Sequence, residues 1–526
     1  MNTQSLSKKT VKVISQMIRT DWIHPYRNSK TSSSIGSGFF INNEGLILTC
    51  SHVIEEAVKV FIEVPHHGDE KMEVDVVGLC PKLDIALLKT RNYKNEEYYE
   101  LHEQNHIYDI KPGLDVYAIG FPLGQENIKY TKGIISGRQY GLIQTDTPIN
   151  PGNSGGPLLL DDKVIGINSS GILFANNIGY ATPIAYYYLI KNELMDSKKK
   201  LIYRPFMGLS YQNSNKPLLD IKKCSCESGI YVKRVFEGSP LEKSGLKKGD
   251  IICSIGGMKI DNFGLLDKMW FNEKMQIDDY LKTIKNNGEI PIEYWRGKKL
   301  FKKKFKYFPF QLTLHELFPL YENKDFEYEV FGGFIVTQLT MNTLKKVINA
   351  ILSKISNKNS VSKRINNILS FLDSEKRTEN RLIITHIFPN SYLDNLDMLS
   401  SYDIIESVNG IKCRTMTEYR KAILNPIKVD GKKYIEIVTD LNNRGIIDVN
   451  EIMKNEVIFS KTYKYKLSSI YSFFKNKSRT IKKSKKDKKD KNGKKDKKDK
   501  NGKKDKKGKK KKTVKKNRRK KVNHNK

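Results

Sequence analysis

The sequence predicts a mostly β protein with three folded units in a row and a disordered basic tail. Three observations lead to this prediction. Short β-rich segments, separated by Gly, Pro, Asn and Asp, fill roughly residues 11–190. A stretch at residues 250–257 is echoed at residues 403–410. Finally, residues 475–526 contain 30 Lys and Arg but only 5 Asp and Glu, so this segment cannot form an apolar core.

The first unit contains β-rich segments such as GFFI, LILT, VKVFIEV, DIALLK, VYAIGF and IGYATPI. Regularly spaced short strands favour a barrel or a sandwich. Thr10–Ile18 is interpreted as the first strand, with a basic transit peptide as the alternative. The Lys-rich stretch Asn192–Tyr203 is expected to form a helical joint to the second unit.

Composition excludes several classes of protein. No apolar run reaches the roughly 18 residues that a membrane-spanning helix needs. Six cysteines are too sparse for a disulfide scaffold, and Cys224 and Cys226 lack a second pair at zinc spacing. We therefore expect reduced thiols, no metal site and no cofactor.

The strongest chemical signal lies in the segment Thr145–Pro157, which contains Gly-Asn-Ser-Gly-Gly. A nucleophilic serine needs a tight turn, with backbone N–H groups free to bind an oxyanion. Ser154 is the candidate nucleophile, and Gly152, Asn153 and Ser154 form the candidate oxyanion hole. A simple glycine turn is the structural alternative.

Two further residues complete a candidate triad. His52 leaves the apolar strand LILT towards a short helix, where a general base can be held. Asp84 opens the apolar strand DIALLK, where a carboxylate needs a hydrogen-bond partner such as an imidazole. Asp146 is a rival acid, but it lies so close to Ser154 in the chain that we expect it to order the turn instead.

The order His52, Asp84, Ser154 and its flanks resemble the HtrA/Deg family of chymotrypsin-fold serine proteases. The matching motifs are Gly36–Phe39, Leu48–Val53, Asp84–Leu87, Ala118–Gly124, Gly133–Ser136, the Ser154 turn and Asn177–Pro183. The resemblance implies a protease domain over residues 1–195, with two six-stranded β-barrels and the active site in the cleft between them.

The resemblance also implies a specificity pocket between the loop Ser169–Gly179 and the turn Ile149–Asn153. Its expected residues are Ile149, Ser169, Ile178 and Gly179, and it would accept small aliphatic side chains before the cleaved bond. The connection Gly137–Leu142 is shorter than the loop with which family members relay peptide binding to the active site. That relay is therefore in doubt here, although Arg138 could reach the activation turn.

The second unit, residues 204–308, resembles a PDZ domain, with a purely structural β domain as the alternative. Such a domain adds an extended peptide to an open sheet edge and holds its C-terminal carboxylate with backbone amides. Phe206, Met207, Gly208 and Leu209 match the carboxylate loop. The third unit, residues 310–465, resembles the divergent second PDZ-like domain of plant-type Deg proteases, with 331–334 as its candidate loop and assembly as its main expected role.

The tail, residues 475–526, is expected to bind polyanions such as RNA or DNA by releasing their counterions, without sequence specificity. A purely solvating tail is an equal alternative. Its Lys/Arg cluster at 515–521 resembles a nuclear-import signal, which favours the nucleus, nucleolus or cytosol. An organelle is the alternative if further residues precede Met1.

These features predict an ATP-independent serine endopeptidase of protein quality control and the stress response, since no Walker-type loop is present. Its expected substrates are unfolded or damaged polypeptides, including exposed C-termini, and its expected chemistry passes through an acyl-enzyme. The family resemblance implies a homo-oligomer, a trimer or a multiple of trimers. The alternative is a proteolytically inactive PDZ chaperone or scaffold with a polyanion-binding tail.

Overall fold

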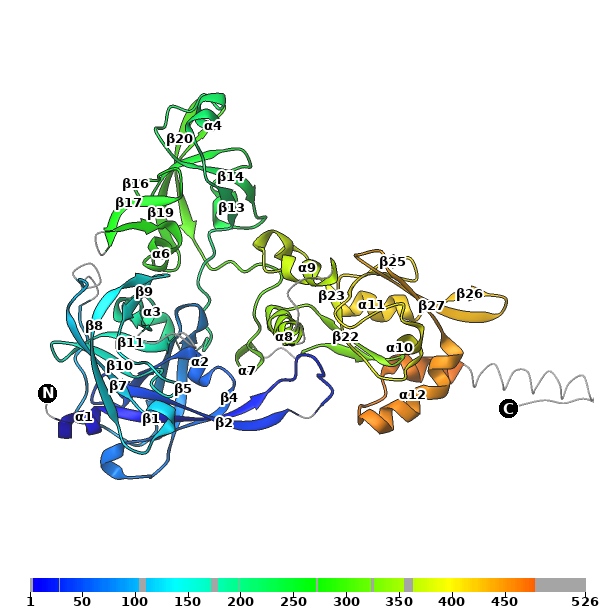
Figure 1. Cartoon of the computed structure of the whole chain (residues 1–526), viewed down its shortest axis with the longest axis horizontal. Coiled ribbons are helices and arrows are strands. Elements are labelled where there is room, and N and C mark those ends of the chain that lie inside the picture. The colour runs from blue at the N-terminus through cyan, green and yellow to red at the C-terminus, as the bar shows by residue number, and fades with distance from the viewer. Residues whose placement is uncertain are drawn as a thin grey trace, which may run out of the picture.

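The computed structural model describes residues 3–27, 29–103, 110–171, 178–196, 198–270, 273–322, 326–353 and 363–477. The described chain is mostly β and forms three successive domains, coloured from blue through green to orange in Figure 1. The predicted fold class is therefore confirmed for this part of the chain. Most of the basic tail, residues 478–526, lies outside the described residues.

The first domain consists of two closed six-stranded barrels. The first barrel contains, in spatial order, β1 (Thr10–Arg19), β2 (Lys30–Phe40), β3 (Leu46–Thr49), β6 (Ile85–Thr90), β5 (Met72–Cys80) and β4 (Ala57–Glu63). The second contains β10 (Pro157–Leu160), β11 (Lys163–Gly171), β12 (Gly179–Pro183), β9 (Leu142–Thr145), β8 (Lys129–Gln139) and β7 (Asp115–Gly120). Closure leaves neither sheet with a free edge.

Short helices connect these strands and position the candidate site. They are α1 (Thr3–Lys9), α2 (Ser51–Ile54), η1 (Pro65–His67), η2 (Pro81–Leu83), η4 (Pro122–Gly124) and α3 (Ile184–Leu194). The predicted strand at Thr10–Ile18 is confirmed as β1. The expected helical joint at 192–203 is wrong beyond Leu194, because the helix ends there in turns and Leu201 forms a parallel bridge to Leu79 of β5. Burial of Leu201, which is only 8% exposed, explains why it leaves the helix.

The second domain is built on a sheet in the order β13 (Leu209–Gln212), β14 (Ile230–Val235), β15 (Ile251–Ile255), β19 (Gly288–Arg296) and β20 (Lys299–Tyr307), with β16 (Met258–Lys259) on β15. Its other elements are α4 (Lys216–Ile221), α5 (Pro240–Lys243), the ribbon β17 (Leu265–Trp270) and β18 (Glu273–Gln276), and α6 (Ile277–Lys282). Among the described residues, β13 pairs with β14 alone. The outer edge of β13 therefore pairs with no second strand in the described part of the chain.

The third domain repeats this strand order. Its sheet runs β22 (Phe334–Gln338), β23 (Leu382–Ile387), β24 (Ile404–Val408), β27 (Lys432–Thr439) and β28 (Arg444–Asp448), with β25 (Ile411–Lys412) on β24. Two strands are additional, β21 (Tyr328–Val330) on β22 and β26 (Ile427–Val429) on β27. The repeated order supports the duplication that the sequence echo indicates.

The remaining helices of this part of the chain are α7 (Pro319–Glu322), α8 (Met341–Leu352), α9 (Lys363–Ser370), η5 (Ser374–Thr378), α10 (Tyr392–Leu396), α11 (Met416–Ile423) and α12 (Val449–Tyr463). Helix α7 lies against the first domain, where the Tyr321 hydroxyl donates to the Ile54 carbonyl at 3.1 Å. The apolar core also includes Ile470, Tyr471 and Phe474, so packing continues beyond Tyr465.

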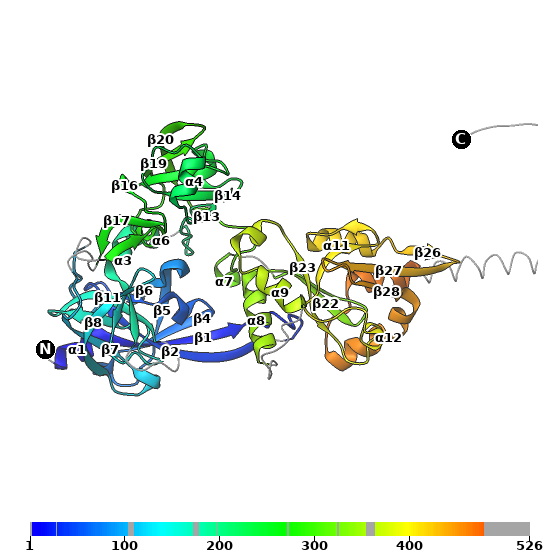
Figure 2. The same ribbon diagram turned by 45° about the horizontal axis from the view of Figure 1, so that its top comes forward.

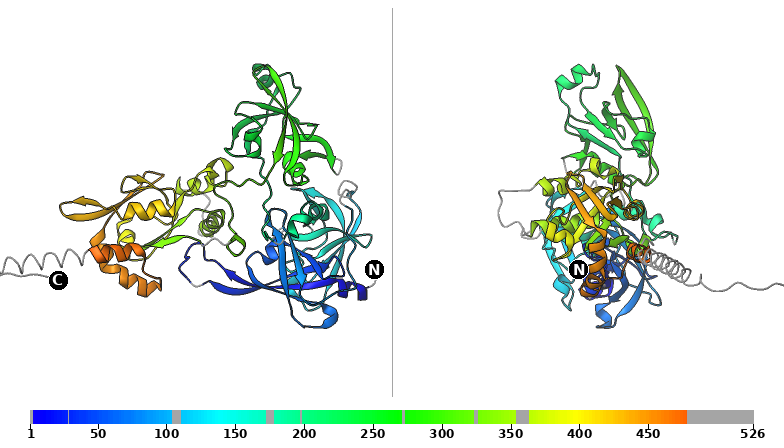
Figure 3. Two further views of the ribbon diagram at one scale, coloured as in Figure 1. Left: turned by 180° about the vertical axis from the view of Figure 1, so that it is seen from behind. Right: turned by 90° about the vertical axis from the view of Figure 1, so that its right-hand side faces the viewer.

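The three domains contact one another pairwise. The β1–β2 hairpin extends from the first domain to the third (Figures 1 and 2), where Tyr26 packs edge-on against Phe388 with ring centroids 5.8 Å apart. Lys233 of the second domain forms an ion pair with Glu375 of the third at 3.1 Å. The views from behind and from the side show the same arrangement (Figure 3). No helix in the described part of the chain combines the length and apolar character needed to cross a membrane.

Candidate active site

The turn that carries Ser154 lies between β9 and β10 and depends on glycine. Gly152 has φ +100°, and a Cβ there would lie 2.2 Å from the carbonyl oxygen of Phe121. Gly155 has φ +90°, and a Cβ there would lie 2.1 Å from the carbonyl oxygen of Ser37. The backbone therefore approaches its neighbours more closely than any other residue type allows.

Hydrogen bonds fix the peptide planes of this turn. The Leu123 N–H donates to the Pro151 carbonyl at 2.6 Å, and the Gly156 N–H donates to the Asn153 carbonyl at 3.0 Å. Because a trans peptide points its N–H away from its carbonyl, these bonds turn the N–H groups of Gly152 and Ser154 to the opposite side. Neither N–H makes a hydrogen bond within the described residues.

The third amide of the predicted hole is engaged. The Asn153 N–H donates to the Asn150 carbonyl at 3.0 Å, so it is not free to bind a developing oxyanion. In this conformation only Gly152 and Ser154 offer unengaged donors.

His52 and Asp84 meet across the first barrel. Helix α2 begins directly after β3, and its buried Val53 and Ile54 anchor it, while the His52 side chain remains 44% exposed. The Nδ1 atom of His52 lies 2.9 Å from each carboxylate oxygen of Asp84. Because a carboxylate accepts, Nδ1 carries the proton and Nε2 is available as a base.

Asp84 follows η2 in a left-handed conformation with φ 54°. Its carboxylate also accepts from the His52 backbone N–H at 3.1 Å and from the Ser169 hydroxyl at 2.6 Å. Burial raises the pKa of Asp84, but these hydrogen bonds and the imidazole outweigh it, and the net pKa is lowered. Burial likewise lowers the pKa of His52, yet the Asp84 hydrogen bond and charge bring the net pKa above its usual value.

Ser154 is linked to this pair through Ser169 and makes no hydrogen bond to either residue in the described chain. Its hydroxyl donates to the Ser169 carbonyl at 2.7 Å, and no hydrogen bond to His52 is present among the described residues. Ser169 therefore contacts two of the three predicted residues, through its carbonyl and its hydroxyl. The sequence analysis assigned Ser169 to the specificity pocket and missed this contact with Asp84.

The predicted specificity pocket is only partly described. A Cβ on Gly179 would lie 2.8 Å from the Ile149 side chain, so these two residues are in contact. Ile149 is 8% exposed, and Ile178 is half-buried. Residues 172–177 of the predicted loop lie outside the described residues.

The Arg138 side chain contacts the second domain. Its guanidinium donates to the Asp279 carboxylate at 3.2 Å and to the Lys274 carbonyl at 2.7 Å, both in the second domain. The Arg138 and Asp279 side chains are only 6% and 4% exposed. Arg138 thus fastens the short β8–β9 connection to β18 and α6 of the second domain.

The predicted carboxylate loop of the second domain precedes β13. Gly208 has φ +82°, and a Cβ there would lie 2.1 Å from Cβ of Ser239. Its carbonyl accepts from the Phe236 N–H at 2.9 Å and from the Ser239 hydroxyl at 3.2 Å. Met207 and Leu209 are buried at 4% and 5% exposure. Phe206 packs against Phe236 with centroids 5.8 Å apart.

The corresponding groove of the third domain is occupied by its own chain. Strand β21 pairs with β22 on the edge that corresponds to the free edge of β13. The Gly332 N–H, which lies in the predicted candidate loop 331–334, donates to the Glu456 carboxylate at 2.9 Å. Arg420 of α11 fastens β21 through Glu329 at 3.0 Å.

Two cysteines differ from the expectation of reduced thiols. Cys226 and Cys253 form a disulfide, which brings together two segments 27 residues apart. Cys50, Cys80, Cys224 and Cys413 are free.

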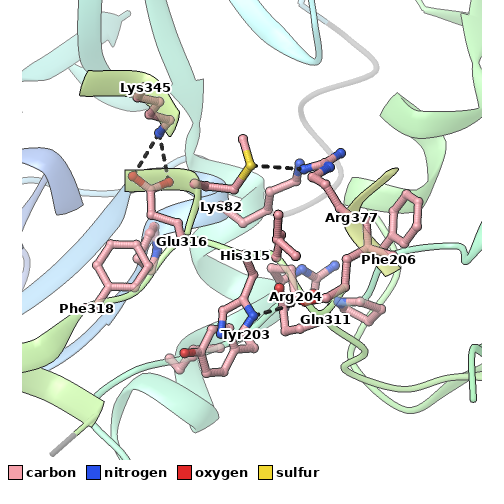
Figure 4. Close-up of a pocket in the computed structure, with 16 residues that line it drawn as sticks. Lys82, Tyr203, Arg204, Phe206, Gln311, His315, Glu316, Phe318, Lys345 and Arg377 are labelled. Atoms are coloured by element: carbon pink, nitrogen blue, oxygen red, sulfur yellow. Dashed lines mark hydrogen bonds and ion pairs between the residues drawn. The ribbon is translucent and has the colours of Figure 1, made fainter. Parts of the chain in front are cut away.

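A cavity of about 410 Å³ lies beside Pro81 and Lys82 of the first domain (Figure 4). Residues from the connecting segments 202–206 and 311–318 also line it. Lys82, Arg204 and Arg377 lie around it, and burial together with the neighbouring cations Lys282 and Arg377 lowers the pKa of Lys82. Lys82 lies two residues before Asp84, so this cavity borders the segment that carries the candidate acid.

Comparisons with known proteins agree with these features. Residues 36–167 match the trypsin-like peptidase domain, and residues 201–276 match the PDZ domain. A probable periplasmic serine endoprotease, DegP-like, from Pseudomonas putida (strain W619) is 35% identical over 245 residues, 44% of this chain and 49% of that protein. The corresponding protein of Chlamydia pneumoniae is 33% identical over 281 residues, 50% of this chain and 55% of that protein. The chain thus spans about half the length of the curated relatives it matches.

Similar solved structures include the HtrA-type protease AlgW with a decapeptide, with 23% identity, a TM-score of 0.45, and coverage of 58% of this chain and 96% of that one. The serine endoprotease from Yersinia pestis has 23% identity and a TM-score of 0.42, and covers 59% of this chain and 97% of that one. The chain thus contains a region similar to the trypsin-like peptidase domain, followed by a region similar to the PDZ domain, and it resembles DegP-like endoproteases over about half of their length.

Proposed function

We propose that this chain is an ATP-independent serine endopeptidase, with Ser154 as nucleophile, His52 as general base and Asp84 as the residue that orients His52. One observation carries the proposal. The His52 ring is hydrogen-bonded to Asp84. Ser169 links Asp84 to Ser154, because its hydroxyl donates to the Asp84 carboxylate and its carbonyl accepts from the Ser154 hydroxyl. The backbone N–H groups of Gly152 and Ser154 make no hydrogen bond in the described chain. A serine, an oriented imidazole and an oxyanion site are the parts that acyl transfer needs.

The reaction begins with a small rearrangement. Rotation about χ1 of Ser154 releases its hydroxyl from the Ser169 carbonyl and directs it towards Nε2 of His52. His52 takes the proton as Oγ attacks the peptide carbonyl, and Asp84 stabilises the imidazolium. The N–H groups of Gly152 and Ser154 bind the tetrahedral oxyanion, and His52 then protonates the leaving amine. Water repeats the sequence to release the acyl group.

The remaining roles are part of the same proposal. Ile149, Ile178 and Gly179 wall a pocket for small aliphatic side chains, and the β13 edge of the second domain receives C-terminal peptides. Unfolded or damaged proteins are the substrates, a trimer or a multiple of trimers is the assembly, and the basic tail contacts polyanions. The third domain, resembling that of plant-type Deg proteases, serves assembly.

One observation favours the alternative of an inactive PDZ chaperone or scaffold. In the present conformation the Ser154 hydroxyl donates to the Ser169 carbonyl and not to His52. A chain locked in this conformation would bind peptides without cleaving them.

A serine-directed phosphonofluoridate distinguishes the two functions. We expect the full chain to gain one phosphonyl adduct on Ser154, because an activated hydroxyl displaces fluoride, whereas an inert hydroxyl does not. Peptide mass mapping locates the adduct. His52→Ala is expected to lose the adduct, while His66→Ala, which changes a histidine in the turn η1, keeps it. A wild-type chain that stays unlabelled, or a His52→Ala chain labelled at the wild-type rate, contradicts the proposal.

The second domain is expected to bind peptides and the third is not. A peptide with a free apolar C-terminus should protect amides of β13 (Leu209–Gln212) from hydrogen exchange in the full chain, but not those of β22, because β21 already covers β22. Amidation of the peptide should weaken binding about tenfold or more, since it removes the carboxylate that accepts hydrogen bonds from the backbone amides of the loop. Titration with fluorescent peptides measures the affinity. Protection of β22 by the peptide would show that β21 is displaceable.

A further inference from the structure

Three cysteine sulfurs lie together in the second domain, away from the protease site. Cys226 and Cys253 are joined as a disulfide, and the sulfurs of Cys224, Cys226 and Cys253 all lie within 4.8 Å of one another. Exchange between a thiol and a disulfide requires a third sulfur within reach of the bonded pair. This cluster meets that requirement.

The two segments that supply the sulfurs differ in secondary structure. Cys253 lies in β15, at the bulge where the register with β19 shifts between Ile252 and Ser254, and it is 8% exposed. Residues 222–229, which carry Cys224 and Cys226, belong to no helix or strand, and both cysteines are half-buried. The sulfur of Cys253 is therefore held by the sheet, whereas the other two sulfurs lie on a turn outside any helix or strand.

The surroundings of the cluster are mainly apolar. Leu219, Ile251 and Trp295 enclose the cluster with apolar surface. The third domain shows that the fold itself does not need sulfur here, because Glu406 occupies the equivalent bulge and pairs with Arg414 at 2.6 Å. The cysteine at this bulge is therefore a feature of the second domain and not a requirement of the sheet that the two domains have in common.

We propose that Cys224, Cys226 and Cys253 form a thiol–disulfide exchange site that lets the turn after α4 change its anchor on β15. Cys224 loses its proton to solvent, and its thiolate attacks Sγ of Cys253. The Cys224–Cys253 bond forms, the Cys226–Cys253 bond breaks, and Cys226 leaves as a thiolate that takes up a proton. No oxidant or reductant is consumed. The site is independent of the proposed protease function.

Burial sets the pH dependence of this exchange. It raises the pKa of the Cys224 thiol above its ordinary value, so little thiolate is present at neutral pH. The exchange should therefore accelerate as the pH rises towards about 9 and should stop in acid.

Disulfide mapping of the full chain tests the proposal. The chain is incubated with reduced and oxidised glutathione, quenched in acid, alkylated and digested. We expect both Cys226–Cys253 and Cys224–Cys253 peptides, the second in about 1–10% of molecules or more. Their ratio should not change with the glutathione ratio, because the exchange is internal. Cys224→Ser should give only the first linkage, and Cys413→Ser, a control in the third domain, should leave both.

Cys226→Ser isolates the exchanged state. We expect it to form Cys224–Cys253 as its only internal disulfide, with β15 amides protected as in the wild type. The proposal is overturned if Cys253 in this variant is alkylated or only glutathionylated while β15 stays protected. If the variant unfolds, the wild type decides, and failure to detect Cys224–Cys253 at any pH up to about 9 overturns the proposal. Retention of Zn²⁺ by the reduced wild-type chain, with all three sulfurs resistant to alkylation, would identify a metal site instead.

Discussion

Replacing Asp84 with asparagine is expected to lower kcat for the cleavage of unfolded casein by roughly 10⁴-fold, with little change in KM. Asp84 accepts from Nδ1 of His52 at 2.9 Å and therefore keeps the proton on that nitrogen. An asparagine amide can donate to Nδ1, which moves the proton to Nε2, the atom that must act as the base. The rate of peptide release, measured by gel and mass spectrometry, gives kcat.

Asp146→Asn is the matched control. The Asp146 carboxylate accepts from the Ile134 N–H at 2.6 Å, so it orders the turn, and an asparagine oxygen can still accept this bond. We expect its cleavage rate to stay within about tenfold of the wild type. Equal losses in the two variants would contradict the assignment of Asp84 as the orienting acid.

The pH profile of cleavage shows whether Asp84→Asn acts on His52 or merely destabilises the fold. Cleavage requires neutral His52, so the wild type should lose activity as the pH falls through the His52 pKa, which lies above its ordinary value. Asp84→Asn removes the negative charge that raises this pKa, and its remaining activity should fall off at a lower pH. A merely destabilised protein would show no such shift.

The order of the candidate residues could be read from the sequence because each one lies in a local motif. Gly152 and Gly155 indicate a turn around Ser154, and the apolar strands before His52 and after Asp84 are short-range patterns. The duplication was visible for the same reason, since an apolar strand followed by a glycine turn repeats at Asp403.

Contacts between distant segments had no such signal. Ser169 bonds to Asp84 across 85 residues, and nothing in the sequence around Ser169 distinguishes it from the next serine. The Cys226–Cys253 disulfide joins a turn to a strand bulge whose position depends on the sheet register. The partner of Arg138 lies in another domain, so it depends on how the domains pack.

The third domain shows a different limit of sequence reasoning. Its glycine loop resembles that of the second domain, and only the pairing of β21 with β22 reveals that the groove is filled. Glu456, which occupies the loop, lies more than a hundred residues away on α12. A carboxylate from the chain itself thus binds an amide of the candidate loop, in a unit whose main expected role was assembly.

Glu456→Gln is expected to remove a pH dependence from the stability of the third domain. Glu456 is 1% exposed and accepts from the Gly332 N–H and the Tyr465 hydroxyl, each at 2.9 Å. Burial raises its pKa to about 7. Because the folded state holds the proton more tightly than the unfolded state, the stabilisation is complete below the unfolded pKa of about 4.5 and is lost as the pH rises to about 7. This shift corresponds to roughly 3 kcal/mol.

Hydrogen exchange of the β22 amides in the full chain, corrected for the intrinsic rates, measures this free energy of opening at about pH 5 and about pH 8. The wild type should open more easily at the higher pH. Glu456→Gln should show the same opening free energy at both, because glutamine is neutral throughout and its oxygen can still accept from Gly332. Glu451→Gln is the control, since Glu451 on the same helix is 37% exposed and pairs with Lys454. Its pH dependence should match that of the wild type, and a Glu456→Gln chain that keeps the wild-type dependence would show that another group carries the titration.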